Sequence, residues 1–332
     1  MSSLVPGYII QGARWDYRNL EHVKGYNTHT SNVFKAEIVQ RTNSSSNALK
    51  SPQWALIKEA SSSDAISMEN MNRECQVYDL PGVNTAKCFR QIYDVIDNRT
   101  IALEWLDTTL ADVQYHPNAR RTYSLIVAVL RAGLTSCILL ERHKRVNTDH
   151  KPANILLSGI DTGHVTAKVG DLGLVVPVGS LFNAQPYAMR APEVFLGQAC
   201  TEPSQVWAVA ALLLCWIKPG VLGTWKSPHP LLREAWCMAK IKRLFPDWNI
   251  PTSDEVGSHS LKAAVDSASY FSKELIDLRA ISPFGEETQG VMPRELRDLL
   301  RSMFVANPVE RPSASAVLAS EEFRAFERLA CE

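Results

Sequence analysis

The longest uninterrupted apolar run in this 332-residue chain is WAVAALLLCWI, at positions 207–217. A helix needs about 20 apolar residues to cross a bilayer, so this run is too short to do so. A helix that is apolar on every side is instead surrounded by protein. The run therefore predicts the central buried helix of a large helical unit.

The two halves of the chain differ in the secondary structure that their residue patterns predict. Residues 30–106 contain three short β-type runs, NVFKAEIVQ, WALIKEA and RTIALEWL, separated by polar stretches. Between the second and third runs, SMENMNRECQVYDL carries apolar residues at three- and four-residue spacing, which predicts one amphipathic helix. Helical patterns dominate from residue 121 onward. We expect a small strand-rich unit, a boundary near Asp107 and a larger helical unit.

Composition excludes several classes of protein. The chain is 45% hydrophobic and 21% charged, as expected of a globular protein. Its 35 basic and 35 acidic residues balance, so no bulk charge attracts nucleic acid or an anionic membrane. The seven cysteines are scattered without metal-ligand spacing, and the N-terminus MSSLVPGYII lacks the order of a signal peptide. We expect a cytoplasmic or nuclear protein that binds neither nucleic acid directly nor a membrane.

The stretch NTDHKPANIL, at 147–156, contains residue types that phosphoryl transfer needs. Such chemistry asks for a carboxylate near the incoming hydroxyl, a lysine for phosphate charge and oxygen ligands for Mg²⁺. Asp149, Lys151 and Asn154 could supply these three parts. Asp171, in KVGDLGL, follows a short β-type segment and could be a second metal ligand. Asp and Gly also favour turns for backbone reasons, so a turn without chemistry is the competing interpretation.

Six segments in order resemble those of eukaryotic protein kinases. NTDHKPANIL resembles the catalytic loop, DLG the metal-binding Asp-Phe-Gly turn, and RAPEVFLG the Ala-Pro-Glu segment. WALIKEA resembles the strand with the phosphate-anchoring lysine, here Lys58, and Glu74 stands where its ion-pair partner is expected. NPVERPSASAVL resembles the closing helix, whose Arg311 is expected to form a buried ion pair with Glu193.

The resemblance implies an α+β, bilobal protein-kinase-like fold with a small β-rich N-lobe and a larger, mainly helical C-lobe. Residues 1–29 would form an N-terminal extension, 30–106 the N-lobe and 107–328 the C-lobe. It implies ATP and Mg²⁺ as the nucleotide and the metal, and a Ser/Thr rather than a tyrosine kinase because Lys151 follows Asp149 by two positions.

The resemblance also assigns roles to residues. Asp149 and Lys151 would be catalytic, and Asn154 and Asp171 would hold magnesium. The remaining assignments are to the nucleotide site: Lys58, Glu74, Val33, Leu56, Glu104, Leu106 and Leu156.

The nucleotide site departs from the family pattern. Aligning on Val33 puts Tyr26, Thr28 and Ser31 where the three glycines of the phosphate loop would stand. Backbone amides approach phosphates most closely without a Cβ, so we expect weaker or altered ATP binding, with the hydroxyls of Thr28 and Ser31 as a partial replacement. Leu56 replaces the usual small alanine beside the adenine, which would narrow the pocket.

The catalytic loop departs as well. Asn147 and Thr148 replace the usual His-Arg pair, and that arginine is the usual receptor for an activation-loop phosphate. Ser180 is the only Ser or Thr between 171 and 193, so we predict that activity does not need phosphorylation there. Gln205 replaces an aspartate that braces the catalytic loop, yet a Gln can still bond to backbone amides. His150 takes a usually apolar position, and a packing or a polar role is open for it.

Branch and substrate rest on weaker analogies. The Thr before Asp149 resembles kinases of Ser/Arg-rich splicing proteins, and the span 224–290 resembles the insert of the group with cyclin-dependent and mitogen-activated kinases. The overall pattern is similar to kinase-like proteins of filamentous fungi. We expect a monomer and a basic or Ser/Arg-rich protein substrate.

Three functions fit these residues. The first is an active Ser/Thr protein kinase, favoured because all six polar residues of the family's site are present: Lys58, Glu74, Asp149, Lys151, Asn154 and Asp171. The second is a pseudokinase that binds nucleotide or serves as a scaffold, supported by the missing glycines, Leu56 and Gln205. The third is a small-molecule phosphotransferase of related fold, which the Ala-Pro-Glu segment and Arg311 disfavour.

Overall fold

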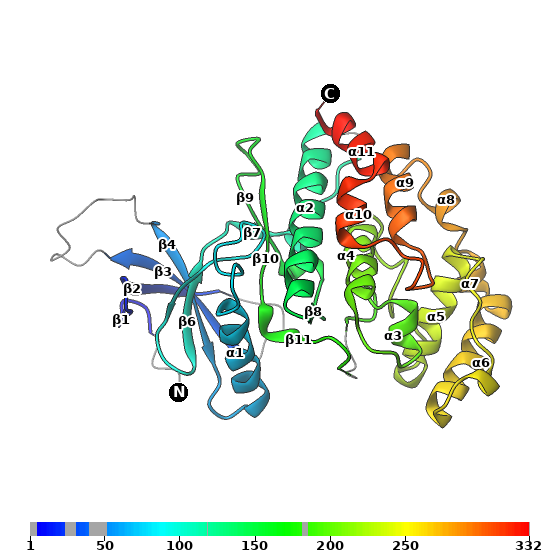
Figure 1. The fold of residues 1–332 in the computed structure, drawn as a ribbon, viewed down its shortest axis with the longest axis horizontal. Helices are drawn as coiled ribbons and strands as arrows, with labels where there is room; N and C mark the ends of the chain where they lie inside the picture. Colours follow the sequence, from blue (N-terminus) through cyan, green and yellow to red (C-terminus); the bar gives the residue numbers. More distant parts are fainter. Residues whose placement is uncertain (1–4, 24–30, 40–51, 118, 181–184, 332) are drawn as a thin grey trace. The chain divides into compact units, whose positions relative to one another are not determined.

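The computed structural model divides the chain into two compact units (Figure 1). Unit 1 comprises Met1–Asp107 and Gly170–Val175, and unit 2 comprises Thr108–Val169 and Val176–Glu332. Unit 1 is rich in strands and unit 2 is mainly helical, which confirms the expected α+β, bilobal class. The structure describes residues 5–23, 31–39, 52–117, 119–180 and 185–331.

Unit 1 is built on an antiparallel sheet of six strands in the order β1-β2-β3-β4-β6-β5. One face carries the core, in which Phe34, Ala36, Ala55 and Ile57 pack together. The bounds are β1 (Ile9–Gln11), β2 (Asp16–His22), β3 (Ser31–Val39), β4 (Trp54–Ala60), β5 (Ile92–Val95) and β6 (Thr100–Glu104).

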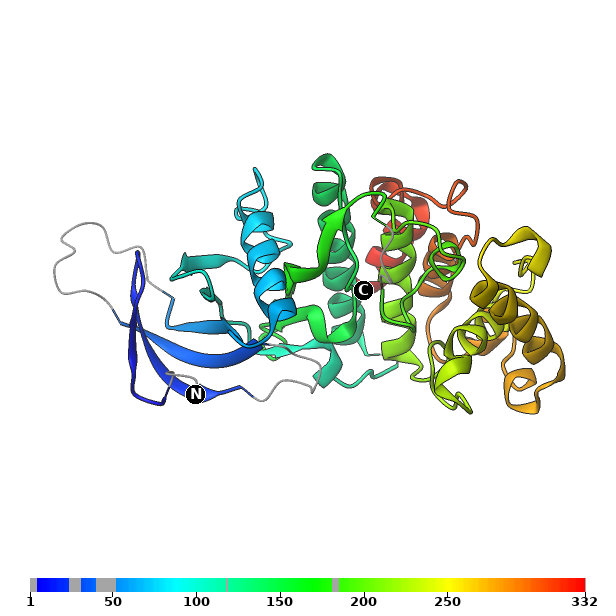
Figure 2. The same cartoon turned by 90° about the horizontal axis from the view of Figure 1, so that it is seen from below.

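The sheet curls until its two edges approach each other, and Figure 2 shows the curvature of its long strands. Asp94, on the edge strand β5, accepts hydrogen bonds from the Tyr17 hydroxyl at 2.5 Å and from the Arg14 backbone at 3.1 Å. Gly12 allows this approach, because a Cβ there would lie 2.5 Å from the Asp94 carboxylate. Of the segment 1–29, which was expected to form an extension, the described residues 9–11 and 16–22 form β1 and β2 of the sheet.

Helix α1 (Ala65–Tyr78) confirms the predicted amphipathic helix between the second and third β-type runs. Asp64 caps its N-terminus by accepting a hydrogen bond from the Ile66 backbone at 2.9 Å. The buried stripe includes Met71 and Tyr78, as the spacing suggests, and also the charged Glu74. A charged residue in a buried stripe calls for a partner.

The core of unit 2 is helix α4 (Glu202–Ile217), of which fourteen of sixteen residues are buried. This confirms the buried helix that the apolar run predicts. Helix α2 (Arg120–Arg142) contacts α4, and Gly133 permits the close approach, since a Cβ there would lie 3.2 Å from Val209. By length and composition α2 could cross a membrane, but 61% of its most apolar window is buried within the protein.

Shorter elements complete unit 2. Helices α5 (Arg233–Leu244) and α6 (His259–Glu274) lie side by side in both views (Figures 1 and 2). The further helices are α3 (Pro192–Phe195), α7 (Ile276–Arg279), α8 (Phe284–Glu287), α9 (Arg294–Met303), α10 (Ala314–Ala319) and α11 (Glu321–Cys331). The strands are β7 (Thr108–Thr109), β8 (Arg145–Asn147), β9 (Ile155–Ser158), β10 (Thr166–Val169) and β11 (Val175–Pro177), and the sheet order is β10-β9-β7. The 3-10 turns are η1 (Leu110–Asp112), η2 (Pro152–Asn154), η4 (Pro230–Leu232) and η5 (Ser253–Glu255); a further one, η3 (Leu172–Leu174), belongs to unit 1.

Candidate functional site

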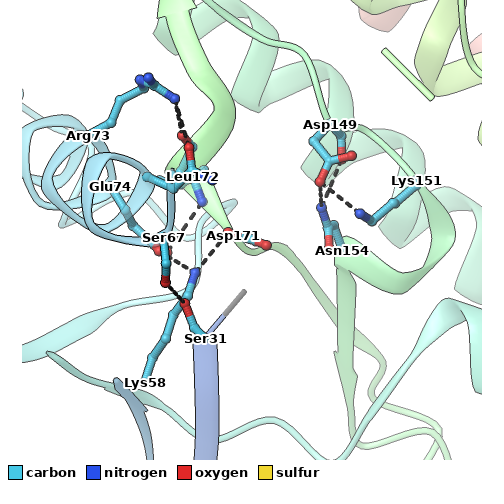
Figure 3. Close-up of polar contacts among 12 residues, drawn as sticks. Ser31, Lys58, Ser67, Arg73, Glu74, Asp149, Lys151, Asn154, Asp171 and Leu172 are labelled. Atoms are coloured by element: carbon cyan, nitrogen blue, oxygen red, sulfur yellow. Dashed lines mark hydrogen bonds and ion pairs between the residues drawn. The ribbon is translucent and has the colours of Figure 1, made fainter. Parts of the chain in front are cut away.

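Lys58 forms two ion pairs within unit 1 (Figure 3). Its Nζ donates to Glu74 Oε2 at 2.6 Å and to Asp171 Oδ1 at 2.9 Å. Glu74 is fully buried and Asp171 is 31% exposed at its side chain. The structure thus brings together three residues that are distant in the sequence and that the kinase resemblance assigns to phosphate and metal binding.

The charge of Lys58 is maintained by these carboxylates. Burial alone lowers the pKa of a lysine, because it disfavours the charged form. At Lys58 the nearby charges of Asp171 and Glu74, together with their hydrogen bonds, outweigh burial and raise the pKa above its ordinary value. The ammonium group is therefore protonated throughout the physiological range and can face an anion.

Helix α1 also holds the DLG turn. Glu74 Oε1 accepts a hydrogen bond from the Leu172 backbone at 3.3 Å, and Arg73 donates to the Gly173 carbonyl at 2.7 Å. A Cβ at Gly173 would lie 3.1 Å from the Asn70 carbonyl oxygen, so a glycine suits this close approach. Asp171 itself has a φ of 53°, in the left-handed region that Asp tolerates better than most residues. The turn is thus held by side chains of α1, in addition to Lys58 of β4.

In unit 2, Asp149 is bound by the two residues predicted to act with it (Figure 3). Lys151 Nζ lies 2.8 Å from Asp149 Oδ2. Asn154 Nδ2 donates to the same oxygen at 2.8 Å and to the Asp149 carbonyl at 2.9 Å. Because the amide nitrogen of Asn154 faces Asp149, its amide oxygen is the atom that could bind a cation.

Two buried polar side chains, of Asn147 and Gln205, accept hydrogen bonds from the backbone of this loop. Asn147 Oδ1 accepts a hydrogen bond from the Asp149 backbone at 2.9 Å. Gln205 Oε1 accepts one from the Asn147 backbone at 2.7 Å, which confirms that a Gln at this position can bind a backbone amide of the loop.

His150 has a packing role in the same loop. Only 1% of it is exposed, and its Nε2 lies 3.8 Å from the thiol of Cys137. Burial lowers the pKa of His150 to about 4, against a smaller opposing effect of a hydrogen bond with Gln205. The imidazole is therefore neutral at physiological pH, which suits a position that is usually apolar in protein kinases.

The first turn of α4 holds three separate segments of unit 2. Glu202 Oε1 accepts from the Ala314 backbone at 2.6 Å, and Ser204 donates to Glu193 at 2.8 Å. Gln205 holds the loop of Asp149, as described above. Helix α4 thus connects the Asp149 loop, the segment of Glu193 and the start of α10.

Glu193 and Arg311 form the predicted buried ion pair. Arg311 donates from its two terminal nitrogens to the two carboxylate oxygens of Glu193, at 2.8 and 2.9 Å. The side chain of Arg311 is fully buried and that of Glu193 is 4% exposed. Arg311 also donates to the carbonyls of Pro203, Val305 and Ala306. The ion pair joins α3 to the segment that precedes α10 within unit 2.

Gln185 is a further anchor that sequence reasoning missed. Its backbone N–H donates to the Thr148 carbonyl at 3.0 Å, its Nε2 to the Ser204 carbonyl at 2.9 Å, and its Oε1 accepts from the Ala191 backbone at 3.0 Å. It adopts a φ of 72° and is buried. Nothing in the sequence marks such a residue, because a left-handed glutamine is uncommon and its partners are distant.

The residues assigned to the nucleotide site divide between the units. Val33 pairs with Lys58 across β3 and β4, and Leu56 lies two positions from Lys58. Cross-strand partners and residues two apart share a face of a sheet, so Val33, Leu56 and Lys58 lie on the face opposite the core. Glu104 ends β6 and Leu106 is buried nearby in sequence, whereas Leu156 lies on β9 in unit 2.

Further observations concern residues that the kinase resemblance assigns to the nucleotide site or to the phosphate loop. The carbonyl of Glu104 already accepts a hydrogen bond from Arg90 Nε at 2.6 Å. Ser31 Oγ lies 3.4 Å from Ser67 Oγ, and Tyr26 and Thr28 lie outside the described residues. Within the described part of the chain, no group of three or more His, Cys, Asp or Glu residues is arranged to hold a metal ion.

Comparisons with known proteins agree with the motif order. The model of the protein kinase domain matches residues 29–323. A stress-activated protein kinase JNK from Drosophila melanogaster is 29% identical over 163 residues. That match spans 40% of this chain and 42% of the JNK protein, so the chain covers less than half of that relative's length.

Proposed function

This chain belongs to the protein kinase family, and on that premise we propose that it transfers the γ-phosphoryl group of ATP to a serine or threonine hydroxyl of a protein. The observation that carries the proposal is the placement of Lys58, which is held between the buried Glu74 and Asp171. Buried ion pairs add little net stability, because the cost of removing the charges from water offsets their attraction. A role in binding a ligand therefore explains this arrangement better than stability does. A cation fixed in this way is suited to phosphate oxygens.

The roles of the other residues follow from their contacts. Asp149 would orient the acceptor hydroxyl and receive its proton, while Lys151, 2.8 Å from Asp149, would offset negative charge on the transferring group. Carboxylate and amide oxygens suit Mg²⁺, so Asp171 and Asn154 would hold the ion, which would neutralise phosphate charge when bound. Gln205 and Asn147 would keep Asp149 in position through the hydrogen bonds of the loop.

A nucleotide-binding or scaffolding role without turnover is the second candidate. Two observations favour it: Arg90 donates to the Glu104 carbonyl, and Leu56 occupies the position of a small alanine. Both would alter the adenine environment. A small-molecule phosphotransferase is disfavoured, because the Glu193–Arg311 ion pair belongs to the protein-kinase pattern.

The test is transfer of labelled γ-phosphate from Mg-ATP to a panel of proteins, with an ATP-induced thermal shift measured in parallel. Asp149→Asn removes the proposed hydroxyl-orienting charge, and Asp161→Asn, at an exposed turn, is the matched control. Transfer by the wild type and by Asp161→Asn, but not by Asp149→Asn, would support the kinase. Equal transfer by Asp149→Asn would contradict the role of Asp149.

The same experiment separates the alternatives. A thermal shift with ATP but no transfer would identify a nucleotide-binding module. Neither a shift nor transfer would indicate a scaffold.

A further inference from the structure

A surface pocket of about 510 Å³ opens beside the loop that carries Asp149. It lies wholly within unit 2. Its lining includes Pro152 of η2, Cys215 and Trp216 at the end of α4, and Val113 and Tyr115 after η1. Both η1 and α4 contact η2. Since Pro152 directly follows Lys151, the pocket adjoins the proposed catalytic residues.

The lining of this pocket is uncharged. Of its nine residues, Gln114 alone has an amide side chain and none has an ionised one. Trp216 Nε1 donates to the Val113 carbonyl at 2.6 Å and the Tyr115 hydroxyl donates to the Val291 carbonyl at 2.8 Å. The Tyr115 and Trp216 rings meet edge to face at 5.3 Å. The polar atoms of both aromatic residues are thus engaged within the protein, and since Trp216 is largely buried, the half-buried Tyr115 offers the larger apolar surface to a ligand.

Charged groups close to the pocket in sequence are paired within unit 2. Lys218 Nζ lies 2.6 Å from Glu287 Oε1 and also donates to the Glu287 carbonyl. Asp112 accepts from the Thr109 hydroxyl at 2.6 Å. Burial raises the pKa of the Cys215 thiol to about 12, so that thiol is neutral at physiological pH. A charged side chain entering the pocket would lose water without gaining a counter-ion from the lining.

We infer that this pocket is a specificity subsite that takes an apolar side chain of the protein substrate, close in sequence to the phosphorylated hydroxyl. The inference rests on the proposed function and narrows it. Continuity with the catalytic loop identifies the occupant as a substrate residue, and the uncharged lining favours an aliphatic or aromatic one. A basic residue, expected for a Ser/Arg-rich substrate, would need a carboxylate that the lining does not provide.

The test uses synthetic peptides with one central serine and the full chain. Each peptide carries Leu, Phe, Lys, Glu or Ala at one of the flanking positions, with Ala elsewhere, and both binding and γ-phosphate transfer are measured. Apolar pockets discriminate side chains that differ by one methylene by roughly 10-fold or more. We expect one position at which Leu or Phe exceeds Lys by at least about 10-fold in binding or in kcat/KM.

Two exposed lining residues provide variants that leave the core intact. Ala111→Phe fills the pocket and should reduce the preference for Leu and Phe, and Gln114→Glu adds a carboxylate of the same size and should raise binding of the Lys peptide. Gln76→Glu, at an exposed position of α1, is the control for the added charge. It should leave the peptide preference unchanged.

The outcomes are distinct. A preference for an apolar residue that shifts in both variants supports the subsite. This holds even if the peptides bind without being phosphorylated. Binding without phosphate transfer would count against the kinase activity but not against the subsite. A wild-type preference for Lys, no preference at any position, or a preference that both variants retain would overturn the subsite. If intact proteins are phosphorylated in that case, the proposed function stands without it. Failure of every peptide to bind or react would also overturn the subsite.

Discussion

Gln205 accepts a hydrogen bond from the backbone N–H of Asn147 at 2.7 Å, so the central helix of unit 2 holds the residue from which the Asp149 loop begins. Both residues are fully buried. A glutamine therefore does at this position what an aspartate usually does in protein kinases, without placing a charge in the core.

The first prediction concerns this hydrogen bond. Gln205→Leu would leave the buried Asn147 N–H unpaired, at a cost of about 1–3 kcal/mol in the free energy of unfolding. Misplacement of Asp149 by about 1 Å is expected to lower kcat about 100-fold, with little change in the KM for ATP. Gln205→Glu keeps an acceptor of the same size and should lose much less. Unfolding curves and steady-state kinetics would check both variants, and equal kcat values in wild type and Gln205→Leu would contradict the bracing role.

The second prediction concerns the buried Glu74. Lys58→Met would remove its ammonium partner and leave the carboxylate buried without a counter-charge, which typically costs about 3–5 kcal/mol. Lys58→Met combined with Glu74→Gln removes both charges and should be less destabilising than Lys58→Met alone. Urea unfolding of the two variants measures the difference. If the double variant were the less stable of the two, Lys58 would not be stabilising the charge of Glu74.

The third prediction follows from the pKa of His150. Because burial lowers that pKa to about 4, the unfolded chain, with an ordinary value near 6.5, binds more protons between these two pH values. His150 therefore makes stability fall as the pH drops from about 6.5 to about 4. In His150→Leu this part of the loss disappears, a difference of about 2–3 kcal/mol at pH 4.5 relative to pH 7.

Unfolding free energies of the wild type and His150→Leu at both pH values provide the measurement. Other titrating groups act equally in the two proteins, so the difference between their pH profiles isolates the imidazole. Parallel profiles would show that His150 has an ordinary pKa in the folded protein.

The fourth prediction concerns Ser180, the only Ser or Thr between residues 171 and 193. The segment after it is tied to unit 2 by Gln185, which binds Thr148, Ser204 and Ala191 without any phosphate. We expect Ser180→Ala and Ser180→Glu to keep the wild-type kcat, whereas Gln185→Ala should lower it. Kinetics on protein free of phosphate, verified by mass spectrometry, would decide. A large gain on phosphorylation of Ser180 would contradict this view.

The sequence predicts features that depend on residue pattern. The apolar run at 207–217 predicts the buried α4, and motif order predicts the ion pair of Lys58 with Glu74, whereas the second ion pair, of Lys58 with Asp171, was not predicted. The sequence also did not predict that β1 and β2, within residues 9–22, join the sheet, because β2 buries Tyr17 and Asn19 between polar neighbours and has only a weak apolar alternation. Patterns of this kind do not distinguish a strand of the sheet from an extension.

Features that depend on backbone conformation or distant contacts could not be predicted either. The φ of 72° at Gln185 is unfavourable for its residue type, and the hydrogen bond from Arg90 to the Glu104 carbonyl joins residues on different parts of the chain. Both are determined by the completed fold and have no local signal in the sequence.

The three bonds from the first turn of α4 have a consequence for synthesis on the ribosome. Asn147 is translated 58 residues before the glutamine that braces it. At about 5–20 residues per second, the Asp149 loop would leave the ribosome several seconds before Gln205 is translated. Ala314, whose backbone N–H donates to Glu202, is translated 112 residues after Glu202. A nascent chain would thus carry Asp149, Lys151 and Asn154 well before the residue that holds their loop in place is translated.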